Sequence, residues 1–277
     1  MTLPRARRRT VLAGAALLAL SLSACTPQTV GAVSPSATPT AERPRSTFTP
    51  PPPTQPTVAS APLRGAEIPV ADAARPALSA KIDNHWDARP QWGLDRTDLV
   101  FEELVEGGLT RYVAVWQSDL PDEIGPVRSI RPMDPDIVSP LGGIIAYSGG
   151  RAPFVAMMQD APVHNAVHGG ADDGFMFRSP ERSAPHNVIL RAADIVSEYA
   201  DLDAPQAQFR YSSSGWAPLF GERSGGLDLR FSTVSPRSWE WSAKDAAYLR
   251  SQEGRPDTAQ GGARITATNV LVLRVAI

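Results

Sequence analysis

The sequence contains a single cysteine, Cys25, so it can form no disulfide within the chain. The stability of any folded part must therefore come from its hydrophobic core and its hydrogen bonds. Cys25 also ends the run Leu22-Ser23-Ala24-Cys25, which is typical of a lipobox, the signal for cleavage and acylation of an exported lipoprotein. We expect the thiol to carry lipid, which leaves none for catalysis.

The N-terminal apolar stretch, Val11 to Leu22, is too short to span a bilayer. It follows a basic cluster of four arginines, Arg5, Arg7, Arg8 and Arg9. We therefore interpret residues 1–24 as a lipoprotein signal peptide, with a chance match at the end of an ordinary secretory signal as the alternative. The arginine pair fits a twin-arginine export motif and an ordinary basic n-region equally well.

Basic residues are too few for a nucleic-acid partner. Removing the signal peptide takes four arginines from 27 basic residues, which leaves 23 against 29 acidic ones and a net charge of −6. A phosphate backbone would repel such a chain. The location that the signal implies is the extracytoplasmic face of the cell membrane, where a lipid anchor holds the protein.

The sequence also lacks the motifs of common catalytic centres. It has no GxSxG nucleophile elbow and no HExxH zinc motif. His164 and His168, with His186 and the pair Asp172-Asp173, allow a metal site to be drawn, but their spacing matches no known ligand pattern. We therefore assign no catalytic residue and expect neither a metal ion nor a cofactor.

Composition divides the chain into a tether and two domains. Residues 25–64 comprise the lipidated cysteine and a Pro/Thr/Ser-rich stretch that cannot bury enough apolar surface to fold, so we expect a disordered tether. A first domain is expected over residues 65–224. A second, smaller and β-rich domain is expected over residues 225–277, apparently cut short within a strand at residues 269–277.

Apolar periodicity and turn residues predict an α+β fold with mixed sheets and short helices. The helices are predicted over residues 134–141, 154–159 and 191–199, and residues 169–186 are predicted to be loop. The strands are predicted over residues 78–83, 99–105, 109–117, 144–148, 227–234, 238–242 and 269–277. Trp239 and Trp241 alternate on one of them, and we favour a core role for both over a sugar-stacking one.

Gly107-Gly108 predicts a hairpin turn, and the turn sets which side chains meet. With those glycines as the turn, Glu103 faces Tyr112 on the apolar side, while Glu102 and Glu106 flank Arg111 on the other. A carboxylate on an apolar face should have a raised pKa unless a cation reaches it. Arg128 and Arg131 are the candidates, and a purely structural ion pair is the alternative.

Two arginines three residues apart, Arg128 and Arg131, lie in an irregular segment between Gly125-Pro126 and Pro132. Guanidinium groups bind carboxylate and phosphate, so these residues indicate an anion site, unless they only satisfy loop carbonyls and Glu103. A histidine in the long loop could join them. The candidate ligand-binding residues are Arg89, Glu103, Glu106, Arg111, Arg128, Arg131, His186 and Asn187.

Several short motifs follow one another in the first domain: Lys81-Ile82-Asp83-Asn84, residues 88–94, residues 98–103, residues 106–111 and residues 124–132. In this order they resemble the YerB-like bacterial lipoproteins, a family whose domain is named only as one of unknown function. The resemblance extends over residues 75–277 and implies an envelope lipoprotein with two domains. It supplies no activity.

Two functions remain open at this point. The first is a binding or assembly factor that recognises an anionic cell-wall glycan, a lipid-linked precursor or an envelope protein through the arginines. The second is an envelope hydrolase or transferase that uses Glu103 or Glu106 as acid or base together with His186. We favour binding, because no nucleophile, metal set or cofactor loop stands out.

Overall fold

The computed structural model describes residues 55–211, 221–222 and 224–275. The predicted signal peptide, Cys25 and most of the predicted tether lie outside this range. Within it, short helices and many strands form mixed sheets, which confirms the predicted α+β class. Among the described residues, none of the helices has the length and apolar character needed to cross a membrane.

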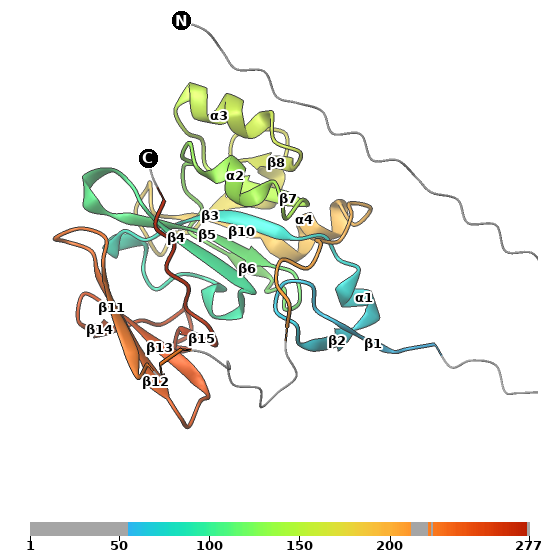
Figure 1. Cartoon of the computed structure of the whole chain (residues 1–277). Helices are drawn as coiled ribbons and strands as arrows, with labels where there is room; N and C mark the ends of the chain where they lie inside the picture. The colour runs from blue at the N-terminus through green and yellow to red at the C-terminus, as the bar shows by residue number, and fades with distance from the viewer. Residues whose placement is uncertain (1–54, 212–220, 223, 276–277) are drawn as a thin grey trace, which may run out of the picture. The chain divides into compact units, whose positions relative to one another are not determined.

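A five-stranded sheet in the order β4-β5-β3-β7-β8 forms the centre of the N-terminal part (Figure 1). Strand β3 pairs in parallel with β7, and β7 with β8, whereas β5 runs antiparallel to both β3 and β4. Every residue of β3 and β7 is buried, as expected for central strands. The bounds are β3 Leu78–Asp83, β4 Leu99–Leu104, β5 Thr110–Trp116, β7 Ile144–Tyr147 and β8 His164–Val167.

Both faces of this sheet are covered. On one face, β-strand residues such as Val113 and Ile145 pack with Val138 and Met158 from helices α2 (Asp134–Val138) and α3 (Ala152–Gln159). On the other face, Ala80 belongs to a core that includes helix α4 (Ala192–Glu198) and the small sheet β6-β10-β9. The bounds of that sheet are β6 Glu123–Ile124, β9 Met176–Arg178 and β10 Val188–Arg191.

The remaining N-terminal elements are short. Strands β1 (Val58–Ser60) and β2 (Glu67–Pro69) pair with each other, and helix α1 (Val70–Ala73) follows them. The 3-10 turns are η1 Trp86–Ala88, η2 Leu94–Arg96, η3 Glu106–Gly108 and η4 Asp173–Phe175. The three longer helices were predicted to within a few residues, but η4, β9 and the strand β10 ahead of α4 were not.

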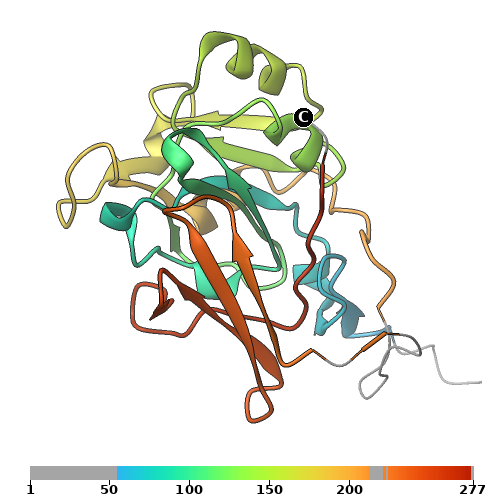
Figure 2. The same ribbon diagram turned by 60° about the vertical axis from the view of Figure 1, so that its left-hand side comes forward.

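The described residues from 224 onward form a smaller unit without helices (Figure 2). Its sheet has the order β11-β12-β13-β14, with β15 also paired to β13, which confirms a smaller β-rich second part. Trp241 is 42% exposed, so the core role predicted for it is wrong. The bounds are β11 Gly226–Arg230, β12 Pro236–Ser242, β13 Ala247–Gln252, β14 Arg255–Pro256 and β15 Thr266–Ala267.

The strand predicted over residues 269–277 is not found in its described part. Residues 269–275 have no strand partner, and Leu271, Leu273 and Val275 are exposed. An apolar run with β propensity predicts a strand only if a neighbouring strand offers hydrogen bonds, and the pairing of β15 with β13 ends at Ala267.

The predicted hairpin register is wrong by one residue. Glu102 pairs with Tyr112, and Glu103 pairs with Arg111. The reason is the loop, because Val105 N donates to Leu109 O and both glycines adopt left-handed backbone in a longer turn than two residues. The shift places Glu103 and Arg111 on one face of the sheet and Glu102 with Tyr112 on the other.

Candidate functional site

Asp83, the last residue of β3, is the centre of a polar cluster. Its side chain is 4% exposed. The carboxylate accepts hydrogen bonds from Arg128 Nε at 3.0 Å, His186 Nδ1 at 2.7 Å and the backbone N–H of His85 at 3.0 Å. Backbone hydrogen bonds hold the arginine segment in place, since Arg128 N donates to the carbonyl of the β3 residue Lys81.

Two further arginines converge beside Asp83. Arg111 lies opposite Asp83 across the β3–β5 ladder, and its Nη1 donates to Ser129 O at 2.8 Å. Arg131 Nη1 donates to the same carbonyl at 3.2 Å, and its Nη2 pairs with Glu106 at 2.5 Å. We call Asp83, Arg111, Arg128, Arg131 and His186 the Asp83 cluster.

The Asp83 cluster holds more positive than negative charge. Among the described residues, Arg111 has no carboxylate within 4.0 Å, unlike Arg128 and Arg131. Burial, together with the nearby charges of Arg131 and Arg128, lowers the pKa of Arg111 to about 10. A guanidinium in this environment would gain from an added anion.

The cluster lies at the carboxyl ends of parallel strands. Asp83 ends β3, and Ser148 and Gly149 follow β7. The arginine segment passes along this edge, because Ser148 N donates to Arg128 O and Ile130 N to Gly149 O. Open α/β sheets bind ligands at this edge of their parallel strands.

Three other predicted residues have different positions. Arg89 donates to Asn84 O at 2.8 Å and pairs with Glu253 of the second unit at 2.9 Å. Asn187 accepts from Arg178 and donates to two carbonyls of its own loop. Glu106 is exposed and pairs with Arg131. The first two residues therefore join or shape loops, and Glu106 lies at the rim of the cluster.

Glu103 is in a buried group next to the cluster. Lys81 Nζ lies 2.7 Å from Glu103 Oε2 and 2.7 Å from Asp134 Oδ1, so two carboxylates share one lysine. Burial raises the pKa of Glu103 to about 7, since Asp134 adds to the effect of burial and Lys81 only partly opposes it. Its Oε1 is buried without a hydrogen-bond partner in the described structure.

The cation that reaches Glu103 is therefore Lys81, and the predicted arginine partners are wrong. The sequence gives no clear signal for this contact, because Lys81 alternates with apolar residues and only the fold shows that all six residues of β3 are buried. A lysine in such a place needs carboxylate partners. Asp83 and His85 were also missed, since neither has a motif of its own and only the fold brings them to His186.

The histidines divide into separate groups. His164 Nε2 lies 2.8 Å from Asp172, and His168 Nδ1 lies 2.6 Å from Asp173. His186 instead contacts Asp83 and stacks on His85, with ring centroids 4.4 Å apart. The three histidines of the metal site drawn from the sequence therefore each contact a different aspartate.

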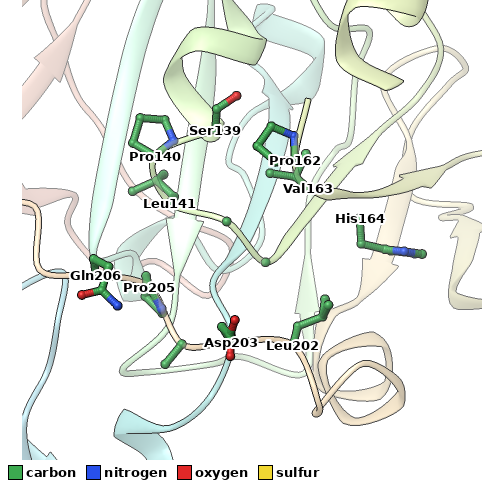
Figure 3. A pocket seen from close by; sticks show the side chains of 13 residues that line it. Ser139, Pro140, Leu141, Pro162, Val163, His164, Leu202, Asp203, Pro205 and Gln206 are labelled. Atoms are coloured by element: carbon green, nitrogen blue, oxygen red, sulfur yellow. The ribbon is translucent and has the colours of Figure 1, made fainter. Parts of the chain in front are cut away.

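A cavity of about 560 Å³ lies elsewhere, at the amino-terminal ends of β7 and β8 (Figure 3). It is lined by loop segments next to these strands, and its lining contains no residue of the Asp83 cluster. A second cavity of about 500 Å³ lies against β11 and β12 and also excludes the cluster. The Asp83 cluster is partly exposed and lies outside both cavities. The lining residues of the first cavity are 139–143, 162–164 and 202–206.

Comparison with known families accounts for most of the chain. Residues 64–205 match the family described as "Protein of unknown function (DUF3048) N-terminal domain", and residues 227–276 match its C-terminal domain. The chain belongs to the DUF3048 family. In this DUF3048 protein, the first matched region covers the N-terminal part with the five-stranded sheet, and the second covers the smaller unit from residue 224 onward.

One similar protein is "Putative lipoprotein YerB" from Bacillus subtilis (strain 168), which is 33% identical over 141 residues. The match spans 51% of this chain but only 42% of the relative. The crystal structure of the Bacillus subtilis YerB protein superposes with a TM-score of 0.63 at 23% identity, over 75% of this chain and 72% of that one. The likeness to YerB that the motifs indicated is confirmed, and the relative's name supports a lipoprotein of unknown function.

Proposed function

We propose that this DUF3048 protein is a lipid-anchored protein on the extracytoplasmic face of the membrane, and that its Asp83 cluster binds an anionic envelope ligand. The lipobox at Cys25 and the name of the YerB relative support the anchor. The Pro/Thr/Ser-rich residues between Cys25 and β1 would serve as the tether that holds the folded part away from the bilayer. The ligand classes are an acidic wall glycan, a lipid-linked precursor or an acidic partner protein.

The observation that carries the proposal is the surplus of guanidinium groups. Arg111 donates only to a carbonyl, and Arg128 uses its Nε alone on Asp83, among the hydrogen bonds of the described residues. The terminal nitrogens of Arg128 therefore remain for a ligand. Forked N–H groups of this kind suit carboxylate and phosphate oxygens.

An envelope hydrolase or transferase is the second candidate. One observation favours it: the pKa of Glu103, raised by burial to about 7, lies in the range of a general acid or base. Asp83 also orients His186 through Nδ1, as a carboxylate orients a catalytic histidine. Glu103 and His186 contact different groups, so the binding function remains the better supported.

Binding can be tested with the Cys25→Ser chain, which we expect to be released from the membrane. The probe is wall fragments that carry phosphodiester polymer, compared with the same fragments after chemical removal of the phosphodiesters. Arg128→Gln should weaken binding to the charged fragments at least tenfold, whereas Arg230→Gln, which removes an exposed arginine in β11, should not. Equal binding of both fragment types, or of both variants, would contradict the proposal.

A further inference from the structure

His85, Asp87 and His186 come together although they are far apart in the sequence. One ligand atom from each lies within 4.8 Å of the other two. Two imidazole nitrogens and a carboxylate oxygen are the donor set that zinc and related divalent ions use in proteins. Of the histidines that the sequence allowed us to draw in a metal site, only His186 belongs to this group.

His186 is held in the form that a metal ligand requires. Its Nδ1 donates to the buried carboxylate of Asp83 at 2.7 Å, so the lone pair is on Nε2. A carboxylate behind a histidine in this way fixes the tautomer and orientation of metal-ligating histidines. Asp83 is itself fixed by Arg128 and by the backbone N–H of His85.

His85 and Asp87 present their ligand atoms side by side. His85 Nδ1 accepts the backbone N–H of Asp87 at 3.2 Å, which places its lone pair on that atom. Asp87 Oδ2 lies 3.5 Å from the same nitrogen, close to the spacing of two ligands on one ion. The Asp87 side chain is 65% exposed, so water can complete the coordination.

The two rings must change their relative orientation to bind one ion. They stack at 16°, and nearly parallel rings hold their lone pairs in parallel planes that do not meet at one ion. His85 is the ring that would have to turn, because the bond of His186 to Asp83 fixes the other ring. The turn exchanges the stack on His186 and the Asp87 N–H bond to His85 Nδ1 for a bond to the ion.

We propose that His85, Asp87 and His186 bind a divalent transition-metal ion of the zinc class, with Asp83 as the residue that orients His186. Nε2 of His186 points away from Asp83, so the ion would lie on the side of the ring opposite Arg128. Metal binding at this site does not depend on the proposed function.

The test is calorimetric titration of the Cys25→Ser chain with ZnCl₂, together with Co²⁺ as a spectroscopic probe. That variant also removes the only thiol, which would compete for the metal. We expect one ion per chain and a visible Co²⁺ absorption band. His186→Gln should abolish both, and Asp83→Asn should weaken affinity about 10- to 100-fold.

The control is His168→Gln, which removes a histidine that also contacts an aspartate but lies in another group. It should leave metal affinity unchanged, and circular dichroism should show that His186→Gln is folded. No zinc binding by the Cys25→Ser chain, or binding that survives His186→Gln, would overturn the proposal. Zinc binding without any wall-fragment binding would contradict the proposed function alone.

Discussion

Two consecutive glutamates of β4 lie on opposite faces of the sheet, and their surroundings differ. Glu102 meets the second unit, where Arg237 Nε lies at 2.8 Å and Arg250 Nη2 at 2.9 Å. Glu103 faces the other way and shares Lys81 with Asp134. Glu102 contacts two arginines, one of which also pairs with Asp257, whereas Glu103 shares a single lysine with Asp134.

The pKa values follow from this difference. Burial alone would raise the pKa of Glu102, but the charges and hydrogen bonds of Arg250 and Arg237 hold it below its usual value. Burial raises that of Glu103 to about 7, because Lys81 cannot offset Asp134 as well. We interpret the group around Glu102, in which the arginines balance the carboxylates, as a structural contact between the two units. The group around Glu103 has more carboxylates than cations and lies next to the arginines of the Asp83 cluster, so it is the better place for a ligand or a proton to act.

The largest expected effect on the free energy of unfolding is in the group around Glu102. Arg250→Met removes one of the two arginines that contact Glu102 and also the arginine that pairs with Asp257. Leaving the buried carboxylate of Asp257 without its arginine should lower the free energy of unfolding by about 3 to 5 kcal/mol. Urea denaturation measures this, with Arg230→Met in β11 as the exposed control. A loss below about 1 kcal/mol would show that the network contributes little.

A smaller and pH-dependent effect is expected at Glu103. Its folded pKa of about 7 exceeds the ordinary value of 4.5, so the folded chain binds more protons between these pH values. Stability should therefore fall as pH rises through this window and level off above it. Relative to Glu103→Gln, the wild type should lose at most about 3 kcal/mol between pH 4.5 and 8. Parallel stability curves for the two proteins would refute the assignment.

The smallest effect on stability is expected for Arg111→Gln. Arg111 loses one hydrogen bond to Ser129 O, worth about 1 kcal/mol, but burial and its neighbouring arginines already disfavour its charge. The free energy of unfolding should change by about 1 kcal/mol or less, while affinity for phosphodiester-bearing wall fragments falls. Chemical denaturation of the same variant provides the comparison. A loss of more than about 3 kcal/mol in the free energy of unfolding would show that Arg111 has a structural role.

The sequence predicted local structure better than contacts. Helices α2 and α3 have a proline in the first turn, which predicted their starts, whereas α4 follows strand β10 directly and was predicted without that strand. The hairpin register was wrong because η3 lengthens the turn, and one added residue moves every side chain to the other face. Arg128, Arg131 and His186 were named as candidates on residue chemistry alone.

The rest of the site depends on long-range pairing that a single sequence does not reveal. Asp83 meets His186 because the arginine segment lies between β3 and β10, with Val127 N donating to Val188 O. Lys81 meets Asp134 because α2 covers the same face of the sheet. Residue spacing predicts neither contact, so the roles of Asp83 and Lys81 became visible only in the fold.

The central claim is that the Asp83 cluster is a binding site and not a structural ion-pair network. The most direct measurement is the affinity of wild type and Arg128→Gln for wall fragments that carry phosphodiester polymer, at a pH where both are folded. We predict that the variant binds at least tenfold more weakly, a difference of about 1.4 kcal/mol. Its urea midpoint should fall less than that of Arg250→Met, because Asp83 keeps its hydrogen bonds from His186 and from the His85 N–H. Unchanged affinity, or no binding by the wild type, would contradict the claim.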